Sequence, residues 1–122
     1  MGRESVDPSE FVPLPTATFH ILLAIRDEEK HGYAIMRDVE ALSDGAVKIG
    51  PGTMYGSIKR MLAEGLIEES DERPDPELDD ERRRYYRCTG LGAQVCTAEV
   101  ERLTKLLKNA YPRRAIPRLG RA

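Results

Sequence analysis

The segment from Glu68 to Glu81 restricts the fold of this 122-residue chain more than any other feature. It holds nine acidic residues and one base, Arg73, so that it alone carries a charge of −8. Pro74 and Pro76 interrupt it. Unpaired carboxylates are costly to remove from water, and proline breaks regular hydrogen-bonded structure. We therefore expect residues 71–83, which contain both prolines and most of the acids, to form an exposed loop.

Two short stretches of strand-like composition flank this loop. Leu66-Ile67-Glu68-Glu69 precedes it, and Arg84-Tyr85-Tyr86-Arg87-Cys88 follows it. Segments rich in β-branched and aromatic residues on either side of a turn-forming stretch are typical of a β-hairpin. The sequence thus predicts a hairpin with a long and highly charged tip.

Apolar residues recur at helical spacing in four other segments. Proline suits the first turn of a helix, and glycine suits its C-terminal cap. A short extended piece is expected at residues 46–49. The expected helices begin after Pro15 with Thr16 as the N-cap, run from about Gly32 to Leu42, run from about Pro51 to Gly65, and run from the N-cap Thr89 to about Tyr111.

The order of these elements predicts a mainly α fold with a small β-hairpin, namely a winged helix-turn-helix with an added C-terminal helix. We expect a flexible N-terminus at residues 1–13, the winged helix-turn-helix domain at 14–88, the added helix at 89–112 and a flexible basic tail at 113–122. The apolar stripe of the added helix consists of Leu91, Val95, Ala98, Leu103, Leu106 and Ala110.

The average charge is a poor guide to what this chain binds. A net charge of −2 and a pI of about 5.7 speak against a nucleic-acid-binding protein. The residues outside the acidic segment, however, hold 18 of the 19 bases and 12 of the 21 acids, and so carry +6. The acidic pI therefore comes from one local segment.

Several classes of protein are not expected from this sequence. The longest apolar run, Ile21–Ile25, is far below the roughly 20 residues of a membrane span. The first ten residues lack the apolar centre of a signal peptide. Two cysteines, Cys88 and Cys96, do not make a disulfide scaffold. We expect a cytoplasmic protein without a metal or cofactor, and a redox role for either cysteine stays open.

The outward face of the predicted third helix is small in its first half and basic in its second. Thr53 and Gly56 let the helix sit deep in a groove. Lys59 and Arg60 can reach phosphates or guanine edges. Tyr55 lies at the edge of the buried face. The pattern favours a helix that enters the DNA major groove, although an ordinary amphipathic surface helix has the same periodicity.

Three consecutive arginines, Arg82, Arg83 and Arg84, stand at the base of the returning strand. Strand alternation places the first and third on one face and the second on the other. A wing that lies over DNA brings at least one of them near phosphates. In the alternative interpretation they neutralise the neighbouring acids, Asp79–Glu81. Both roles are compatible, because DNA can compete for arginines that an acidic tip holds.

Four short motifs occur in the order and spacing of a known family. They are HGYAI at residues 31–35, GPGTMYGSIKRM at 50–61, GLI at 65–67 and DDERRRYYRCT at 79–89. Each motif alone is weakly specific, but the four together are strong. On these motifs the chain resembles the PadR family of bacterial transcriptional regulators over about residues 13–107.

The resemblance implies a homodimeric winged-helix repressor that binds a near-palindromic DNA operator. In such proteins the third helix reads the major groove, the wing contacts the backbone and the C-terminal helix pairs across the two-fold axis. The residues implied for dimerisation are the apolar stripe of the C-terminal helix given above. His31 and Tyr33 would serve packing or phosphate contact near the third helix. The full set implied for DNA binding is His31, Tyr33, Thr53, Tyr55, Gly56, Ser57, Lys59, Arg60, Arg82, Arg83 and Arg84.

Two other functions stay open from the sequence. One is a sensor of the same fold that binds a small aromatic or apolar effector at the dimer interface, near the first and fourth helices. The chain has no tryptophan, so the stacking mode of some family members is not available to it. The other is a protein–protein adaptor without DNA binding, which the acidic segment motivates. No catalytic frame is recognisable, so we expect no enzyme activity.

Overall fold

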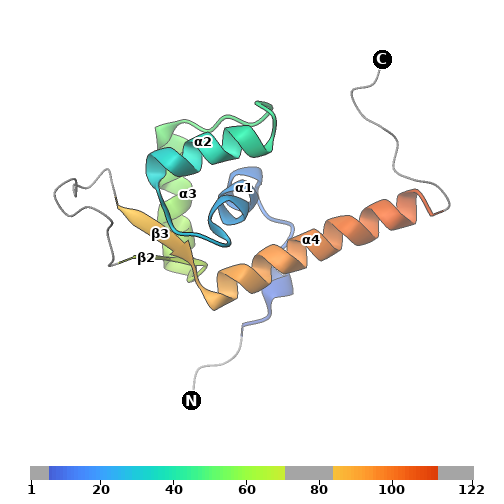
Figure 1. Cartoon of the computed structure of the whole chain (residues 1–122). Helices are drawn as coiled ribbons and strands as arrows, with labels where there is room; N and C mark the ends of the chain where they lie inside the picture. Colours follow the sequence, from blue (N-terminus) through green and yellow to red (C-terminus); the bar gives the residue numbers. More distant parts are fainter. Residues whose placement is uncertain (1–5, 71–83, 113–122) are drawn as a thin grey trace.

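The structure is a helical domain with a small antiparallel sheet and a long C-terminal helix (Figure 1). The computed structural model describes residues 6–70 and 84–112. The predicted fold class, a winged helix-turn-helix with an added C-terminal helix, is confirmed. The elements are η1 (Pro8–Phe11), α1 (Thr16–Ile25), β1 (Lys30–His31), α2 (Gly32–Leu42), α3 (Pro51–Glu64), β2 (Ile67–Glu69), β3 (Tyr85–Cys88) and α4 (Gly90–Ala110).

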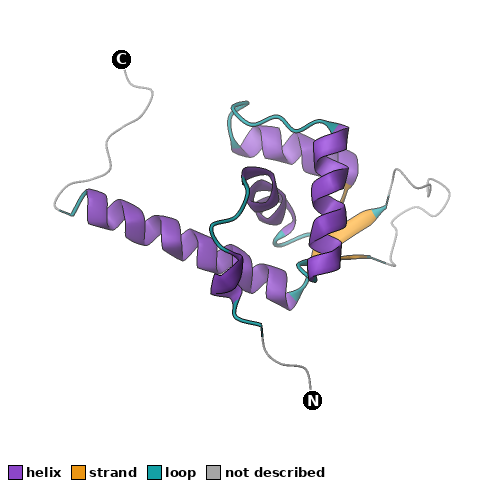
Figure 2. Ribbon diagram, turned by 180° about the vertical axis from the view of Figure 1, so that it is seen from behind, coloured by secondary structure: helices purple, strands orange, loops and turns teal. Residues whose placement is uncertain are grey.

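The first α-helix, α1, lies at the centre of the domain. Its side chains Ile21, Leu22 and Ile25 are fully or almost fully buried. The helices α2, α3 and α4 surround it, as Figures 1 and 2 both show. These three helices and the sheet complete the core with Ile35, Val39, Met54, Ile58, Met61, Leu66, Ile67, Tyr86, Val95 and Cys96.

The sheet has β3 in its middle, with β1 on one side and β2 on the other. The strands β2 and β3 pair antiparallel, with Ile67 opposite Cys88, as the predicted hairpin requires. The strand β1 was not predicted from the sequence. It places Lys30 opposite Tyr86. A two-residue strand is too short to have an alternation of apolar and polar residues that could be recognised in the sequence. It forms only through pairing with a strand much later in the chain.

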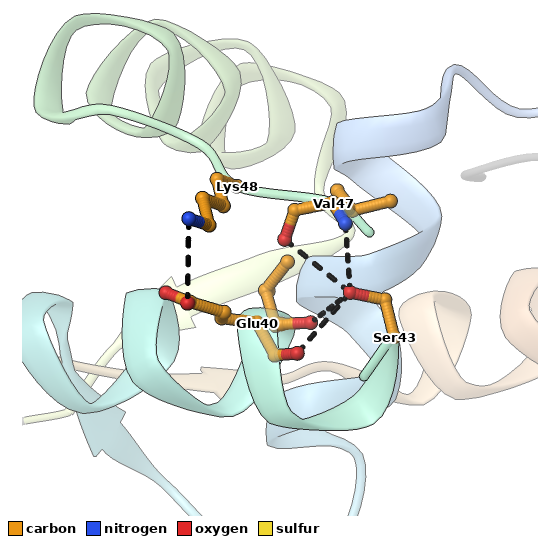
Figure 3. Close-up of polar contacts among 5 residues, drawn as sticks. Glu40, Ser43, Val47 and Lys48 are labelled. Carbon is orange, nitrogen blue, oxygen red and sulfur yellow. Dashed lines mark hydrogen bonds and ion pairs between the residues drawn. The ribbon is translucent and has the colours of Figure 1, made fainter. Parts of the chain in front are cut away.

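Residues 46–49, which were predicted to be extended, form an irregular connection between α2 and α3. The Ser43 hydroxyl explains this difference. It accepts a hydrogen bond from the Val47 N–H at 2.9 Å (Figure 3). It also donates to the Val39 carbonyl oxygen at 3.1 Å. Because these bonds satisfy the backbone locally, no partner strand is required. The half-buried Val47 and Ile49 pack against the core, which accounts for their apolar character.

The segment before α1 was predicted to be flexible up to residue 13. Residues 8–11 instead form η1, which Asp7 caps by accepting a hydrogen bond from the Ser9 N–H. Both η1 and Leu14 are attached to α4. This attachment joins residues far apart in the sequence, so local composition gives no sign of it. Residues 1–5 lie outside the described part of the chain.

A buried carboxylate, Glu99, makes that attachment. Its side chain is only 3% exposed, and it accepts a hydrogen bond from the Leu14 N–H at 3.0 Å. Arg102 donates to both of its oxygens, at 2.6 and 3.2 Å. The Arg102 bonds are the main reason that the pKa of Glu99 lies below its ordinary value, and the Leu14 N–H lowers it further, against the opposing effect of desolvation.

The base of the hairpin is a compact hydrogen-bonded unit, here called the wing-base joint, formed by Gly65, Leu66, Thr89 and Gly92. Gly65 ends α3 with a φ of +80°, which glycine adopts without strain. The Thr89 N–H donates to the Leu66 carbonyl at 3.1 Å. The Thr89 hydroxyl donates to the Gly65 carbonyl at 2.6 Å and accepts from the Gly92 N–H at 3.0 Å. The predicted caps Gly65 and Thr89 are confirmed. The predicted N-cap Thr16 is wrong, because α1 already begins at Thr16, its N-cap is Pro15, and no side chain caps it.

The close approach at Gly92 predicts a large effect of one methyl group. A Cβ at this position would overlap the carbonyl oxygen of Leu66 and lie 2.9 Å from its carbonyl carbon. Because the backbone itself must move, Gly92→Ala is expected to lower the free energy of unfolding by about 3 kcal/mol. Gly90→Ala is the matched control, since a Cβ there meets no atom within 4 Å. Urea unfolding of the two variants measures the difference, and equal stabilities would contradict the close approach.

The Glu99 site predicts a specific dependence of stability on pH. A carboxyl group whose pKa is lowered by folding stabilises the fold above its unfolded pKa of about 4.3. That contribution is lost as the pH falls through the lower pKa of the folded state. Glu99→Gln is therefore expected to be less stable than the parent by about 1–2 kcal/mol at neutral pH. The deficit should shrink below about pH 4.

The exposed Glu101 provides the control for this experiment. Glu101→Gln removes the same charge from the same helix without touching the Leu14 attachment, and it should leave stability unchanged within about 0.5 kcal/mol. Thermal unfolding from neutral to acidic pH compares the three proteins. A deficit of Glu99→Gln that does not change with pH would show that the ionised carboxylate has no part in the attachment.

Candidate nucleic-acid interface

The exposed face of α3 brings together four of the residues predicted to contact DNA. Thr53, Gly56, Lys59 and Arg60 are all exposed, while the apolar residues of the opposite face are buried. No acidic residue occurs in α3 before Glu64. The N-terminus of α3 has no side-chain cap, so its first N–H groups can donate to an anion. This face is therefore small and positively polarised at its start, and basic further along.

Two other predicted residues of α3 are placed differently. Ser57 is only 8% exposed, so its side chain does not share the surface of Lys59, which speaks against its predicted contact with DNA. The reason is helical spacing, because Ser57 lies three residues after Met54 and four before Met61, which are both buried. Tyr55 is half-buried at the edge of the face, as predicted.

The start of α2 packs on the start of α3. A Cβ on Gly32 would lie 2.5 Å from the hydroxyl oxygen of Tyr55, so glycine permits the contact. His31 caps α2, since its Nδ1 accepts from the Ala34 N–H at 3.3 Å, and its ring lies edge-on to Tyr85 with centroids 5.4 Å apart. Its observed role is therefore structural. Tyr33 is 48% exposed beside this contact, which leaves its ring and hydroxyl accessible.

The described arginines of the wing are paired with acids on the neighbouring strand. Arg84, directly before β3, donates to Glu69 of β2 at 2.8 Å, and Arg87 of β3 donates to Glu68 of β2 at 2.8 Å. All four side chains are between one third and one half exposed. Pairs this exposed are weak and can exchange for other anions. The predicted contacts Arg82 and Arg83, and the acids at 79–81, lie outside the described residues.

The apolar stripe of α4 divides into two parts. Val95 is fully buried in the core of its own chain, which contradicts its prediction as a dimer contact, whereas Leu91 is half-buried against that core and its role in a dimer stays a prediction. The N-terminal half of α4 packs against α1 and β3, whereas the C-terminal half extends away from the domain (Figure 2). Of the predicted dimer contacts, Leu103 and Ala98 are half-buried and Leu106 and Ala110 are exposed. Further exposed apolar side chains on this half are Val100, Leu107 and Tyr111.

One basic residue near α3 was not among the predicted contacts. Lys48 lies two residues before the N-cap of α3, and its side chain is 71% exposed. It makes a long ion pair of 3.9 Å with Glu40 (Figure 3). The position of Lys48, just before the exposed N-terminus of α3, is the sequence feature that would have identified it as a candidate DNA contact.

The two cysteines have the character of core thiols. Burial raises the pKa of Cys88 to about 11, with Cys96 as a further cause, and burial also raises the pKa of Cys96. Both thiols are therefore protonated at neutral pH. Because the thiolate is the reactive form, protonated thiols react slowly. Within residues 6–70 and 84–112, no group of three potential ligands is placed to hold a metal ion. In the same ranges, no helix is both long and apolar enough to cross a membrane.

Comparison with models of known protein families shows the family to which the chain belongs. Residues 21–98 match the Transcriptional regulator PadR-like family, which is more than half of the sequence. The chain belongs to the PadR-like family. The resemblance seen in the four motifs is thereby confirmed, and members of this family are transcriptional regulators rather than enzymes. A curated relative, Transcriptional regulator Rv3488 of Mycobacterium tuberculosis, is 33% identical over 89 residues, which are 73% of this chain and 77% of the relative.

Solved structures of other PadR proteins share the fold. A PadR family transcription regulator from hypervirulent Clostridium difficile R20291 has a TM-score of 0.62 at 22% identity, with 80% of this chain and 99% of that one covered. Bacillus subtilis PadR in complex with operator DNA has a TM-score of 0.56 at 17% identity, with 90% of this chain and 54% of that one covered. At these identities the likeness shows the fold.

Proposed function

We propose that this PadR-like regulator is a homodimeric repressor that binds a near-palindromic DNA operator with one α3 in each of two successive major grooves. The observation that carries the proposal is the exposed face of α3, where Thr53 and Gly56 are followed by Lys59 and Arg60. The solved complex of Bacillus subtilis PadR with operator DNA supports it, because that protein has the same fold.

The chemistry of this face matches a major groove. The small side chains of Thr53 and Gly56 let the helix backbone approach the base edges. Arg60 has a planar guanidinium that can donate two hydrogen bonds to one guanine, and Lys59 provides a point charge for a phosphate. Lys48 and the first N–H groups of α3 lie where a phosphate can be bound at the groove edge. Tyr33 adds an accessible hydroxyl beside them.

The wing contributes through ion-pair exchange. Arg84 is partly exposed and held by Glu69. A DNA phosphate presents the same kind of anionic oxygens as this carboxylate, and it can replace Glu69 when the hairpin lies along the backbone. We assign Arg84 this role, which is independent of base sequence.

The C-terminal half of α4 supports the homodimer. Leu106 is 54% exposed, and Val100, Leu107 and Tyr111 are each 38–39% exposed, all beyond the point where α4 leaves its own core. An apolar stripe on a protruding helix is typical of a helix that pairs with another helix. A second copy of the chain offers an identical stripe, and two-fold pairing presents two copies of α3 to a near-palindromic operator.

Removal of the basic side chains of α3 tests the DNA-binding face. An operator is first selected from a random DNA pool with the whole chain. Lys59→Ala and Arg60→Ala are each expected to weaken operator binding about tenfold, and loss of a phosphate contact should reduce the slope of log affinity against log salt by about one.

Lys105→Ala is the control for these variants. It removes the same kind of charge from the exposed polar side of α4 and should change operator affinity less than about twofold. If Lys59→Ala and Arg60→Ala both bind the operator as tightly as the parent, α3 does not make the groove contact.

A charged residue in the apolar stripe of α4 tests the dimer. Leu107→Asp places a carboxylate in the proposed helix pair, and it is expected to weaken dimerisation at least about tenfold. Lys105→Asp introduces the same side chain on the polar side of the same helix and should leave the dimer intact. Sedimentation equilibrium measures the mass against the 13.7 kDa of one chain. A parent that sediments as a monomer, or a Leu107→Asp variant that dimerises like the parent, would refute this interface.

A further inference from the structure

We propose that Thr89 is a positioning residue that sets the spacing of the operator half-sites, because it locks the dimerisation helix α4 to the end of the DNA-reading helix α3. This inference rests on the proposed function, since it assumes that α3 reads DNA and that α4 dimerises. The Thr89 hydroxyl group would thus fix the orientation of α3 relative to α4, which neither helix determines alone.

The hydrogen bonds of the wing-base joint form a continuous path from α3 to α4. The Leu66 N–H donates to the Met61 carbonyl at 3.0 Å, which fastens Leu66 to the last turn of α3. The Leu66 carbonyl in turn accepts from the Thr89 N–H at 3.1 Å. Through its hydroxyl, Thr89 then contacts the Gly65 carbonyl at 2.6 Å and the Gly92 N–H at 3.0 Å. Each of these hydrogen bonds restrains the distance and direction between the two groups that it joins.

Steric contact at the same place removes the remaining freedom. Gly92, in the first turn of α4, lies so close to the Leu66 carbonyl that no side chain fits. The glycine at Gly65 turns the chain out of α3 within one residue. The first turn of α4 therefore cannot rotate or slide on the end of α3 without breaking hydrogen bonds or overlapping backbone atoms.

The angle between the two helices has a direct consequence for DNA. In a dimer held by α4, the distance and rotation between the two copies of α3 depend on how each α3 is fixed to its own α4. Successive base pairs rotate the groove by about 35°, so a small change in that angle matches a different number of base pairs between the half-sites. A rigid joint selects one spacing, whereas a loosened joint tolerates several.

The two hydrogen bonds of the hydroxyl can be separated by substitution. Thr89→Ser retains both. Thr89→Asp retains the cap, because aspartate accepts from the Gly92 N–H as well as threonine does, but it has no proton to donate to the Gly65 carbonyl at neutral pH. Thr89→Ala removes both bonds without adding a charge, and it tests the hydroxyl as a whole if the aspartate variant does not fold. Circular dichroism and sedimentation establish that each variant is folded and dimeric.

The test measures binding to a panel of DNA duplexes. The whole parent chain selects an operator from a random pool, and the half-site spacing is then changed by one and by two base pairs in either direction. The parent and Thr89→Ser should prefer the selected spacing over a two-base-pair change by about tenfold or more. For Thr89→Asp the preference should fall below about threefold, while affinity for an isolated half-site stays within about twofold of the parent.

The outcomes separate this inference from the proposed function. If the parent enriches no DNA, the proposed function fails and this inference fails with it. If the parent has a clear operator but Thr89→Asp and Thr89→Ala keep its full spacing preference, the inference alone is overturned. Equal loss of affinity for whole operators and isolated half-sites would also overturn it, because such a loss places the effect within α3 rather than between the two helices.

Discussion

The contact between the first turn of α4 and the carbonyl group of Leu66 is the constraint on which the rest of the structure depends. It requires glycine at Gly92, and it places Thr89 where its hydroxyl can reach Gly65. The end of α3, the two ends of the hairpin and the start of α4 are thereby brought to one point. The strand β3 leads into this point and is the middle strand of the sheet, so the contact also restrains β1, which pairs with β3. The helix α2 begins at Gly32, directly after β1, and its start is restrained as well.

The parts of the fold that were predictable are those whose cause is local. Helix ends at Gly65 and Thr89 follow from the φ preference of glycine and the capping ability of threonine, and both are visible in the sequence. The strand at Lys30, the attachment of Leu14 to Glu99 and the burial of Val95 depend on partners far along the chain. In the candidate site, the exposure of Lys59 follows from periodicity. The periodicity of α4 shows which residues are apolar, but not whether its own chain or a second copy covers them.

The distribution of charge gives the proposed interface both attraction and restraint. The basic residues of α3 face outward, and α3 holds no acid before Glu64. On the hairpin, by contrast, Glu68 and Glu69 hold arginines that DNA would otherwise attract. A random duplex must displace these carboxylates with its phosphates alone. An operator also forms base contacts with α3, which compensate for the lost ion pairs. The acidic net charge of the chain is therefore consistent with a selective DNA-binding protein.

The helix α4 has a part that packs into the core of the domain and a part that extends away from it, and Glu99 lies at the boundary between the two parts. On its N-terminal side Val95 and Cys96 lie in the core, and on its C-terminal side most of the apolar residues are exposed. An apolar residue at position 99 would make the stripe continuous, so that a second helix could pair in more than one register. A carboxylate held by Arg102 and by the Leu14 N–H adds little stability compared with an apolar side chain of similar size, but it is satisfied in only one arrangement. Buried polar groups at such positions specify register in paired helices. The same group can therefore define where the folded domain ends and where the proposed interface with a second copy begins.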